Sequence, residues 1–184
     1  KIDIDNIKAN GLVSLNSDEM AAGVDRDFIY YLSKQEDLTK QSLPRTLWKT
    51  TNVTTGYDSY ESRTRILDNL TNIIAMFPSF IDETDVFLLD SSHRLYLVNG
   101  IIKTSNEITG FTPNQKPVKV VTNNEKAYVL TTEGNIYLIN LLTNTVDTTD
   151  GVTSGDAIDF ALSSEENPIV YLDKKGVLYD PERY

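Results

Sequence analysis

The stretch AYVLTTEGNIYLINLLTNTV, residues 127–146, contains two short apolar runs separated by a polar turn with glycine at position 134. Runs of this length that are rich in Val, Ile, Leu and Tyr and bounded by turn residues are typical of paired β-strands. The stretch has two counterparts elsewhere, VFLLDSSHRLYLVN at 86–99 and IVYLDKKGVLYDP at 169–181. The chain therefore repeats one hairpin unit.

The repeats have a nearly constant spacing. Their aligned tyrosines, Tyr96, Tyr137 and Tyr179, lie 41 and 42 residues apart, and a period near forty indicates an array of structural repeats. A fainter copy, IYYLSKQEDLTK at 29–40, gives a fourth repeat.

Each repeat predicts four short strands. The first strands are expected at 12–15, 73–76, 118–121 and 158–161. In the faint copy, the second and third strands are expected around Leu32 and Leu38, while weaker fourth runs follow the tyrosines of the better copies. A helical apolar period is absent except for a short helix expected between 65 and 77. The pattern predicts an all-β fold of small antiparallel four-stranded sheets.

The turn between the second and third strands gives an independent check. A type I turn that leads into a G1 bulge needs one residue at positive φ, which glycine adopts without a Cβ clash. Gly134 and Gly176 occupy this position in two repeats, and His93, the single histidine, occupies it in a third. Histidine is one of the few other residues enriched at positive φ. We therefore interpret His93 as a turn residue.

Four-stranded sheets that recur every forty residues are typical of a β-propeller, where each blade covers an apolar face of the next. The stretch TTEGNIYLINLLTNTV resembles the repeat of pyrroloquinoline-quinone-type propellers, and the repeat of regulator-of-chromosome-condensation propellers is a comparable match. The positions that carry the resemblance are Gly134, Ile136, Tyr137, Asn140 and Thr143, with Asn144 in place of a glycine. The docking tryptophan of the first family is missing, because the single Trp48 lies elsewhere. The resemblance implies the architecture and no cofactor.

We expect residues 1–184 to form a single domain of about four blades, with a loop insertion at about 40–65. The last repeat stops after its third strand, and the alternating sequence KIDIDNI at 1–7 would supply the missing strand and close a small ring. The alternative is that these blades form part of a larger propeller.

Composition excludes several classes of function. The net charge is −10, whereas binding of nucleic acid or anionic membranes depends on basic surfaces. No apolar run is long enough for a membrane-spanning helix, and without cysteine the chain has no disulfide framework or thiolate nucleophile. The compartment and the oligomeric state remain open.

The segment 40–65 is the candidate docking surface, since it carries five cations and only two acids in an acidic chain. Aromatic residues and arginine dominate the hot spots of protein interfaces, and loops on a rigid scaffold often carry function. The candidate partner-binding residues are Arg45, Trp48, Tyr57, Tyr60, Arg63 and Arg65. For Trp48, packing in the outer strand of the first blade is an equal alternative. The segment favours a protein partner and a non-enzymatic interaction or scaffold module, within a larger complex or a viral particle.

The alternative function is a carbohydrate-active hydrolase or lyase with carboxylates at the central channel. Paired carboxylates for such chemistry must lie across a cleft, which sequence spacing does not test. A triad built from His93 and its neighbours Asp90, Ser91 and Ser92 is disfavoured, because adjacent turn residues do not align for proton transfer. We assign no catalytic residue, metal ligand or cofactor from the sequence.

Overall fold

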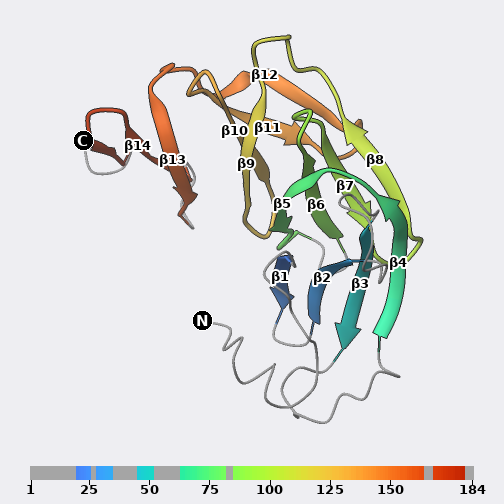
Figure 1. The fold of residues 1–184 in the computed structure, drawn as a ribbon. Helices are drawn as coiled ribbons and strands as arrows, with labels where there is room; N and C mark the ends of the chain where they lie inside the picture. The colour runs from blue at the N-terminus through green and yellow to red at the C-terminus, as the bar shows by residue number, and fades with distance from the viewer. Residues whose placement is uncertain are drawn as a thin grey trace.

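The computed structural model of the chain describes residues 20–25, 28–34, 45–51, 63–81, 85–163 and 168–180. Every regular element within these ranges is a β-strand, and the strands form four antiparallel sheets that follow one another along the chain (Figure 1). In each sheet, neighbouring strands are paired in chain order, as in a meander. The prediction of an all-β fold of small antiparallel sheets is confirmed.

The bounds of the strands define the four sheets. The first sheet contains β1 (Met20–Asp25), β2 (Phe28–Lys34), β3 (Arg45–Thr51) and β4 (Arg63–Leu70). The second contains β5 (Ile73–Pro78), β6 (Asp85–Asp90), β7 (Leu95–Asn99) and β8 (Thr104–Ile108). The third contains β9 (Pro117–Thr122), β10 (Ala127–Thr131), β11 (Ile136–Asn140) and β12 (Thr145–Val152). The fourth contains β13 (Ala157–Leu162), β14 (Ile169–Asp173) and β15 (Leu178–Tyr179).

The repeated tyrosines occupy equivalent positions in three sheets. Tyr96, Tyr137 and Tyr179 lie in the third strands β7, β11 and β15. Across the hairpin, their register partners are Leu88, Val129 and Tyr171, respectively. Each partner precedes the hairpin turn by the same number of residues, so the sequence period corresponds to a structural repeat.

The hairpin turns have the predicted backbone conformation. His93, Gly134 and Gly176 have φ angles of 60°, 81° and 82°. In the first of these turns, the N–H of His93 donates to the carbonyl of Asp90, and the N–H of Asp90 donates to the carbonyl of Arg94, both at 3.0 Å. The same pair of backbone hydrogen bonds recurs in the turns that contain Gly134 and Gly176. The interpretation of His93 as a turn residue at positive φ is confirmed.

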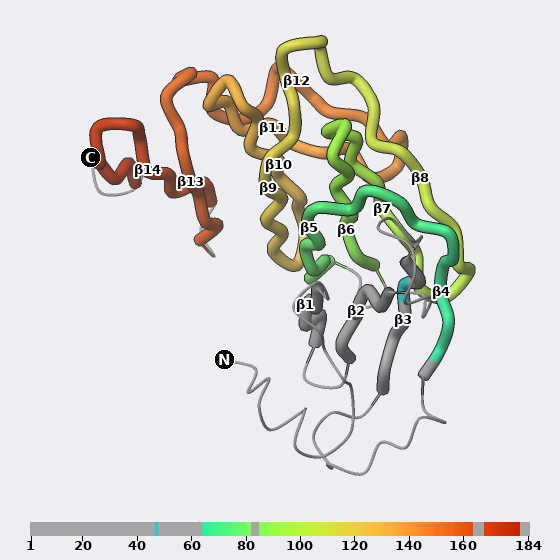
Figure 2. Tube along the Cα trace, in the orientation of Figure 1, coloured from blue at the N-terminus to red at the C-terminus, as the bar shows by residue number. Residues whose placement is uncertain are grey.

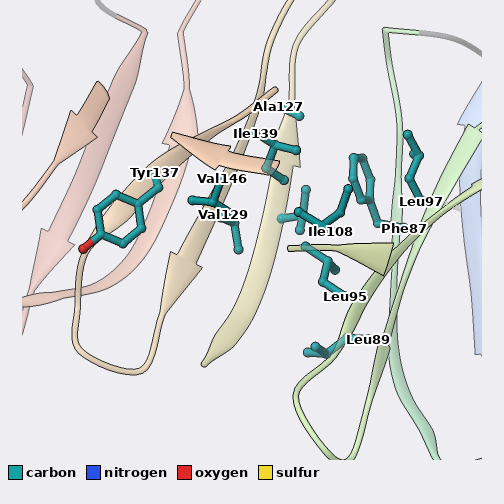
Figure 3. Packing of buried hydrophobic residues seen from close by; sticks show 11 residues of the cluster. Phe87, Leu89, Leu95, Leu97, Ile108, Ala127, Val129, Tyr137, Ile139 and Val146 are labelled. Atoms are coloured by element: carbon teal, nitrogen blue, oxygen red, sulfur yellow. The ribbon is translucent and has the colours of Figure 1, made fainter. Parts of the chain in front are cut away.

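The second and third sheets pack face to face on a shared core. Phe87 and Leu95 from the second sheet belong to one buried cluster with Val129 and Ile139 from the third, and all four side chains are at most 3% exposed. Figure 3 shows these side chains between the two sheets. A single sheet cannot cover its own apolar faces, so each sheet depends on its neighbour for burial.

The other neighbouring sheets pack in the same way. Leu47 and Ile66 of the first sheet share a cluster with Leu88 of the second. Ile136 of the third sheet shares another cluster with Phe160 of the fourth. The second and third sheets are therefore buried on both faces, which is the packing expected of propeller blades.

The four sheets follow an open arc in Figure 1. In Figure 1 the first sheet lies at the lower end of the arc and the fourth at its upper left end, and Figure 2 traces the second, third and fourth sheets in the same orientation. Residues 1–7, expected to close a small ring, lie outside the described residues. Closure of a four-bladed ring by this segment stays a prediction.

The first sheet differs in detail from its predicted form. Its third strand is β3, whereas the sequence pattern placed that strand around Leu38; the expected first strand at 12–15 lies outside the described residues, and β1 begins at Met20. The segment 40–65, expected as a loop insertion, contributes β3 and the start of β4. The connection between β2 and β3 is longer than the equivalent connections in the other three sheets. This extra length gave the sequence pattern of an insertion.

The short helix expected between 65 and 77 is also wrong, because these residues lie in β4, in β5 and in their connection. Asn69 and Asn72 have φ angles of 57° and 60°, a left-handed conformation that a right-handed helix cannot accommodate. A short apolar run does not distinguish a strand from a helix by periodicity alone.

Candidate interaction surface

Four of the six candidate partner-binding residues lie in neighbouring strands of the first sheet. Arg45 and Trp48 belong to β3, and Arg63 and Arg65 belong to β4. Trp48 is the register partner of Arg65. The other two candidates, Tyr57 and Tyr60, lie outside the described residues.

The register shows what position Trp48 has in its sheet. Trp48 pairs with Tyr31 of β2, as Tyr96 pairs with Leu88 in the second sheet. The residue before Trp48 is the fully buried Leu47, just as the residue before Tyr96 is a fully buried leucine. Trp48 therefore occupies, in the first sheet, the position that tyrosine occupies in the other three.

Arg65 is the best described of the basic candidates. Its side chain is 56% exposed, and its Nε donates to Oδ1 of Asp68 at 2.5 Å. Ion pairs between exposed groups contribute little to stability, because water competes for both charges. The guanidinium group remains exposed to solvent.

The structure shows a second set of exposed residues that sequence reasoning missed. Ile101 and Ile102, in the turn between β7 and β8, are 67% and 68% exposed. Leu142, in the equivalent turn between β11 and β12, is 96% exposed. Apolar residues within a turn between two strands were the available sequence signal, since such turns are usually polar.

These two turns have the same rigid construction. Asn99 Oδ1 accepts hydrogen bonds from the backbone N–H groups of Ile101 and Ile102, both at 3.0 Å. Asn140 Oδ1 accepts from the N–H of Leu142 at 3.0 Å and from the N–H of the next residue at 3.2 Å. The turns therefore present apolar side chains to solvent from a hydrogen-bonded backbone.

The last residues of the two turns are also equivalent. Lys103 and Asn144 have φ angles of 58° and 54°. Asn144 was the one departure from the glycine of the repeat motif, and it adopts the left-handed conformation that glycine would have there. Asparagine tolerates this conformation better than most residues with a Cβ.

His93 and its neighbours are engaged in structural contacts. The ring Nδ1 of His93 lies 3.3 Å from the carbonyl oxygen of Pro117. The buried Asp90 carboxylate accepts from the N–H groups of Ser92 and Arg94 and from Arg94 Nε, at 2.8–2.9 Å. These contacts link the second sheet to the third and stabilise the turn, and they do not align a nucleophile with a base.

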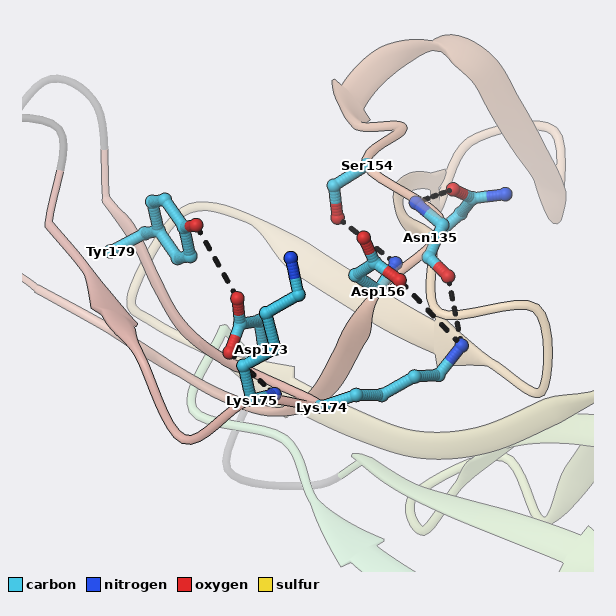
Figure 4. Close-up of polar contacts among 8 residues, drawn as sticks. Asn135, Ser154, Asp156, Asp173, Lys174, Lys175 and Tyr179 are labelled. Carbon is cyan, nitrogen blue, oxygen red and sulfur yellow. Dashed lines mark hydrogen bonds and ion pairs between the residues drawn. The ribbon is translucent and has the colours of Figure 1, made fainter.

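Two described carboxylates, Asp159 in β13 and Asp173 at the last hairpin turn, have a lowered pKa. Lys119 Nζ donates to Asp159 Oδ1 at 2.5 Å, and this hydrogen bond lowers the pKa of Asp159. Donation by the N–H groups of Val177 and Lys175 lowers the pKa of Asp173, and Tyr179 donates to its Oδ2 (Figure 4). A general acid needs a raised pKa, so these two carboxylates give the hydrolase alternative no support.

Neither a metal-binding cluster nor a membrane-spanning helix is found in the part of the chain that the structure describes. Among the residues that the structure describes, no three acidic or histidine side chains gather closely enough to hold a metal ion. No helix in the described ranges is long and apolar enough to cross a membrane.

Comparisons with known proteins establish the fold. The sequence matches no family model, and no relative emerges among curated proteins. In structure, the chain is similar to the crystal structure of HIRA(644-1017), with a TM-score of 0.53 and 8% sequence identity. The similarity covers 88% of this chain and 51% of that chain, so this chain spans about half the length of its structural neighbour.

The structural neighbour is a β-propeller. The chain has a β-propeller fold. At this low identity the likeness extends to the fold alone, and the four sheets of the chain correspond to successive blades.

Proposed function

We propose that the chain is a non-enzymatic protein-interaction or scaffold module that docks a protein partner through residues displayed on its blades. The sequence of the blades resembles the pyrroloquinoline-quinone-type repeat. In this proposal the resemblance concerns the architecture and implies no cofactor. Assembly into a larger complex or a viral particle is the setting that this role implies.

The observation that carries the proposal is the exposure of Ile101, Ile102 and Leu142 on equivalent turns. A rigid turn loses little backbone entropy when it binds a partner, and its apolar side chain becomes buried. Preorganised turns with apolar side chains therefore favour docking. Tight hydrogen bonding by Asn99 and Asn140 supplies this preorganisation.

The first sheet adds a second contact region to the proposed surface. Arg45, Trp48, Arg63 and Arg65 lie in two neighbouring strands, within the locally basic segment of an acidic chain. Arginine and tryptophan are enriched at interface hot spots. We include Tyr57 and Tyr60, from the connection between these strands, in the same proposed region.

Point substitutions test this surface, because deletion of 40–65 would remove β3 from the first sheet. The intact protein and the variants Leu142→Ser, Ile101→Ser and Arg65→Glu are compared as baits in a quantitative pull-down with identification of the bound proteins. The expected result is loss of the same partner from one or more of these baits.

Two matched variants control for changes in surface chemistry. Val118→Ser removes another exposed apolar side chain, and Lys116→Glu reverses another exposed charge. Both are expected to keep the partner, and all variants are expected to keep the far-UV circular dichroism of the intact chain. If the three surface variants bind every partner as the intact chain does, this docking surface is wrong.

A further inference from the structure

The outer edge of the second sheet is an exposed strand with a regular register. In β8 the first four residues are exposed and only the last, Ile108, is buried. The pairing of β7 with β8 continues through all five residues of β8 without a register shift. A strand at a sheet edge presents unpaired backbone N–H and C=O groups, to which a further strand can bind.

The outer edges of the two neighbouring sheets are interrupted. The register between β11 and β12 shifts, so that residues 148–150 of β12 are left out of the pairing. The register between β3 and β4 shifts at two places. Such irregularities protect sheet edges from an added strand, as do lysine and proline. The sequence TSNEI of β8 contains neither residue, and its pairing has no shift.

The chain itself shows that a strand can pair on this side of β8. Thr109, which directly follows β8, forms a parallel bridge with Thr145 of the third sheet. The N–H of Thr109 donates to the carbonyl of Asn144, and the N–H of Val146 donates to the carbonyl of Thr109, both at 2.9 Å. The pairing is therefore already present at one end of the edge.

The backbone groups of β8 alternate between its two sides. Since successive residues of a strand direct their N–H and C=O groups to opposite sides, Ser105 and Glu107 direct theirs to the same side as Thr109. Among the described residues, β8 pairs with β7 alone, and the bridge of Thr109 lies just beyond its end. The outward groups of Ser105 and Glu107 are thus placed for a further strand.

The two exposed apolar turns lie at opposite ends of this edge. Ile101 and Ile102 are in the turn that leads directly into β8. At the other end, Leu142 lies two residues before Asn144, the residue that accepts from Thr109. The five residues of β8 span roughly 17 Å. The bridge therefore brings turns from two different sheets to the two ends of one open strand.

The position of β8 in the fold keeps its edge at the perimeter. β8 lies on the outer side of the arc (Figure 1). The neighbouring sheets pack on the faces of the second sheet, the first sheet against Leu88 and the third against Phe87. Any further blade would extend the arc beyond the first or the fourth sheet and would not cover an outer edge.

We propose that the protein partner binds as an extended peptide segment that adds a strand to β8. The backbone of the segment pairs with the outward N–H and C=O groups of Ser105 and Glu107. Apolar residues at its two ends contact the turn of Ile101 and the turn of Leu142. Glu107 is the single charged residue of β8, so the segment carries a basic residue opposite it. This inference rests on the proposed function and names the class of partner.

Selected peptides test the proposal. Phage-displayed random peptides are selected on the intact chain, and the affinity of each enriched peptide is measured by calorimetry. The enriched sequences should have apolar residues on both sides of a basic one. Ser105→Pro removes an N–H that faces the open edge and not β7, so the far-UV spectrum should not change. This variant should bind the peptides about tenfold more weakly.

The matched control Ser105→Ala keeps the backbone N–H and should bind the peptides as the intact chain does. Failure to enrich any peptide would overturn the proposal, and so would equal affinity of the peptides for Ser105→Pro and for the intact chain.

Amide hydrogen exchange distinguishes an added strand from docking by side chains alone. With an enriched peptide bound, exchange of the Ser105 and Glu107 N–H groups should slow by about tenfold or more, because both become hydrogen-bonded. The N–H of Asn106 faces β7 and should slow less. Equal slowing at the three positions, or none, would show that the peptide does not extend the sheet, contrary to the proposal.

The pull-down described for the proposed function separates the two proposals. Ser105→Pro should lose the same partner as Leu142→Ser. If Leu142→Ser loses the partner while Ser105→Pro keeps it, the docking surface stands and the added strand is wrong. If Ile101→Ser, Leu142→Ser, Arg65→Glu and Ser105→Pro all keep the partner, the docking surface is wrong as well.

Discussion

The substitution Gly134→Ala is expected to destabilise the chain much more than Gly176→Ala, although both glycines occupy the same turn position with φ near 80°. A Cβ at Gly134 would lie 2.8 Å from the carbonyl carbon and oxygen of Gly155 and 2.9 Å from the nitrogen of Asp156. A Cβ at Gly176 would meet no atom within 4 Å. The pair therefore separates the effect of backbone conformation from the effect of the inter-sheet contact.

The magnitudes follow from these two effects. A left-handed conformation costs an alanine roughly 1–2 kcal/mol, and the smaller entropy of the unfolded chain returns about 0.4–1 kcal/mol. Gly176→Ala should thus reduce the free energy of unfolding by about 1 kcal/mol. At Gly134, forcing backbone atoms apart adds roughly 1–3 kcal/mol. The shift would also disturb the hydrogen bond from the N–H of Ala157 to the Gly134 carbonyl, at 3.1 Å.

Thermal and urea unfolding, followed by far-UV circular dichroism, measure the difference. A gap of about 2 kcal/mol corresponds to roughly 4–8 °C between the two variants in a chain of this size. Gly134→Ala should have the lower midpoint in both experiments. Equal losses for the two glycines would refute the reasoning, because backbone conformation alone would then explain both.

Three further predictions concern the core, the histidine turn and pH. Phe87→Ala should lower the free energy of unfolding by about 3–5 kcal/mol in urea titrations, because the ring is fully buried between two sheets. His93→Gly should cost at most about 1.5 kcal/mol, since glycine keeps the positive φ and loses only the contact with Pro117. His93→Ala should unfold at lower urea than His93→Gly, because alanine loses the contact and is strained at positive φ. Asp173 has a lowered pKa in the folded chain, chiefly through donation by the N–H of Val177. Its contribution is therefore complete at neutral pH and is lost as the pH falls below about 4. The urea midpoints of the intact chain and Asp173→Asn should differ at pH 7, and the gap should narrow as the pH is lowered below about 4; a gap that stays constant would contradict this assignment.

The better repeats were predictable because their local signals agree with their packing. The spacing of Tyr96, Tyr137 and Tyr179 places matching strands correctly, and the turn positions of His93 and Gly134 have the expected positive φ. In these sheets the connections within the hairpins are short and equal in length, so equivalent strand positions recur at a nearly constant spacing in the sequence. The repeat pattern is a direct consequence of the packing of one blade on the next.

The first sheet was misread because its repeat lacks these local signals. Residues 35–44 separate β2 from β3, and tryptophan stands at the position of tyrosine. The exposed Leu142 and Ile101 were missed for a different reason. Sequence reasoning assigns an apolar residue next to a strand to the core. The structure places these residues in turns, where their side chains are exposed to solvent.

One exchange between repeats shows how neighbouring blades constrain each other's sequence. Pro117 and Ala157 are the equivalent first residues of β9 and β13, as the hairpin register shows. The N–H of Ala157 donates to the carbonyl of Gly134 in the preceding sheet, but proline has no N–H to donate to His93. There the His93 ring reaches the Pro117 carbonyl, so a side-chain contact links the sheets where the backbone bond is impossible. A Cβ at Gly134 would meet backbone atoms of Gly155 and Asp156, whereas the equivalent turn of the second sheet carries the Cβ of His93 at a similar positive φ.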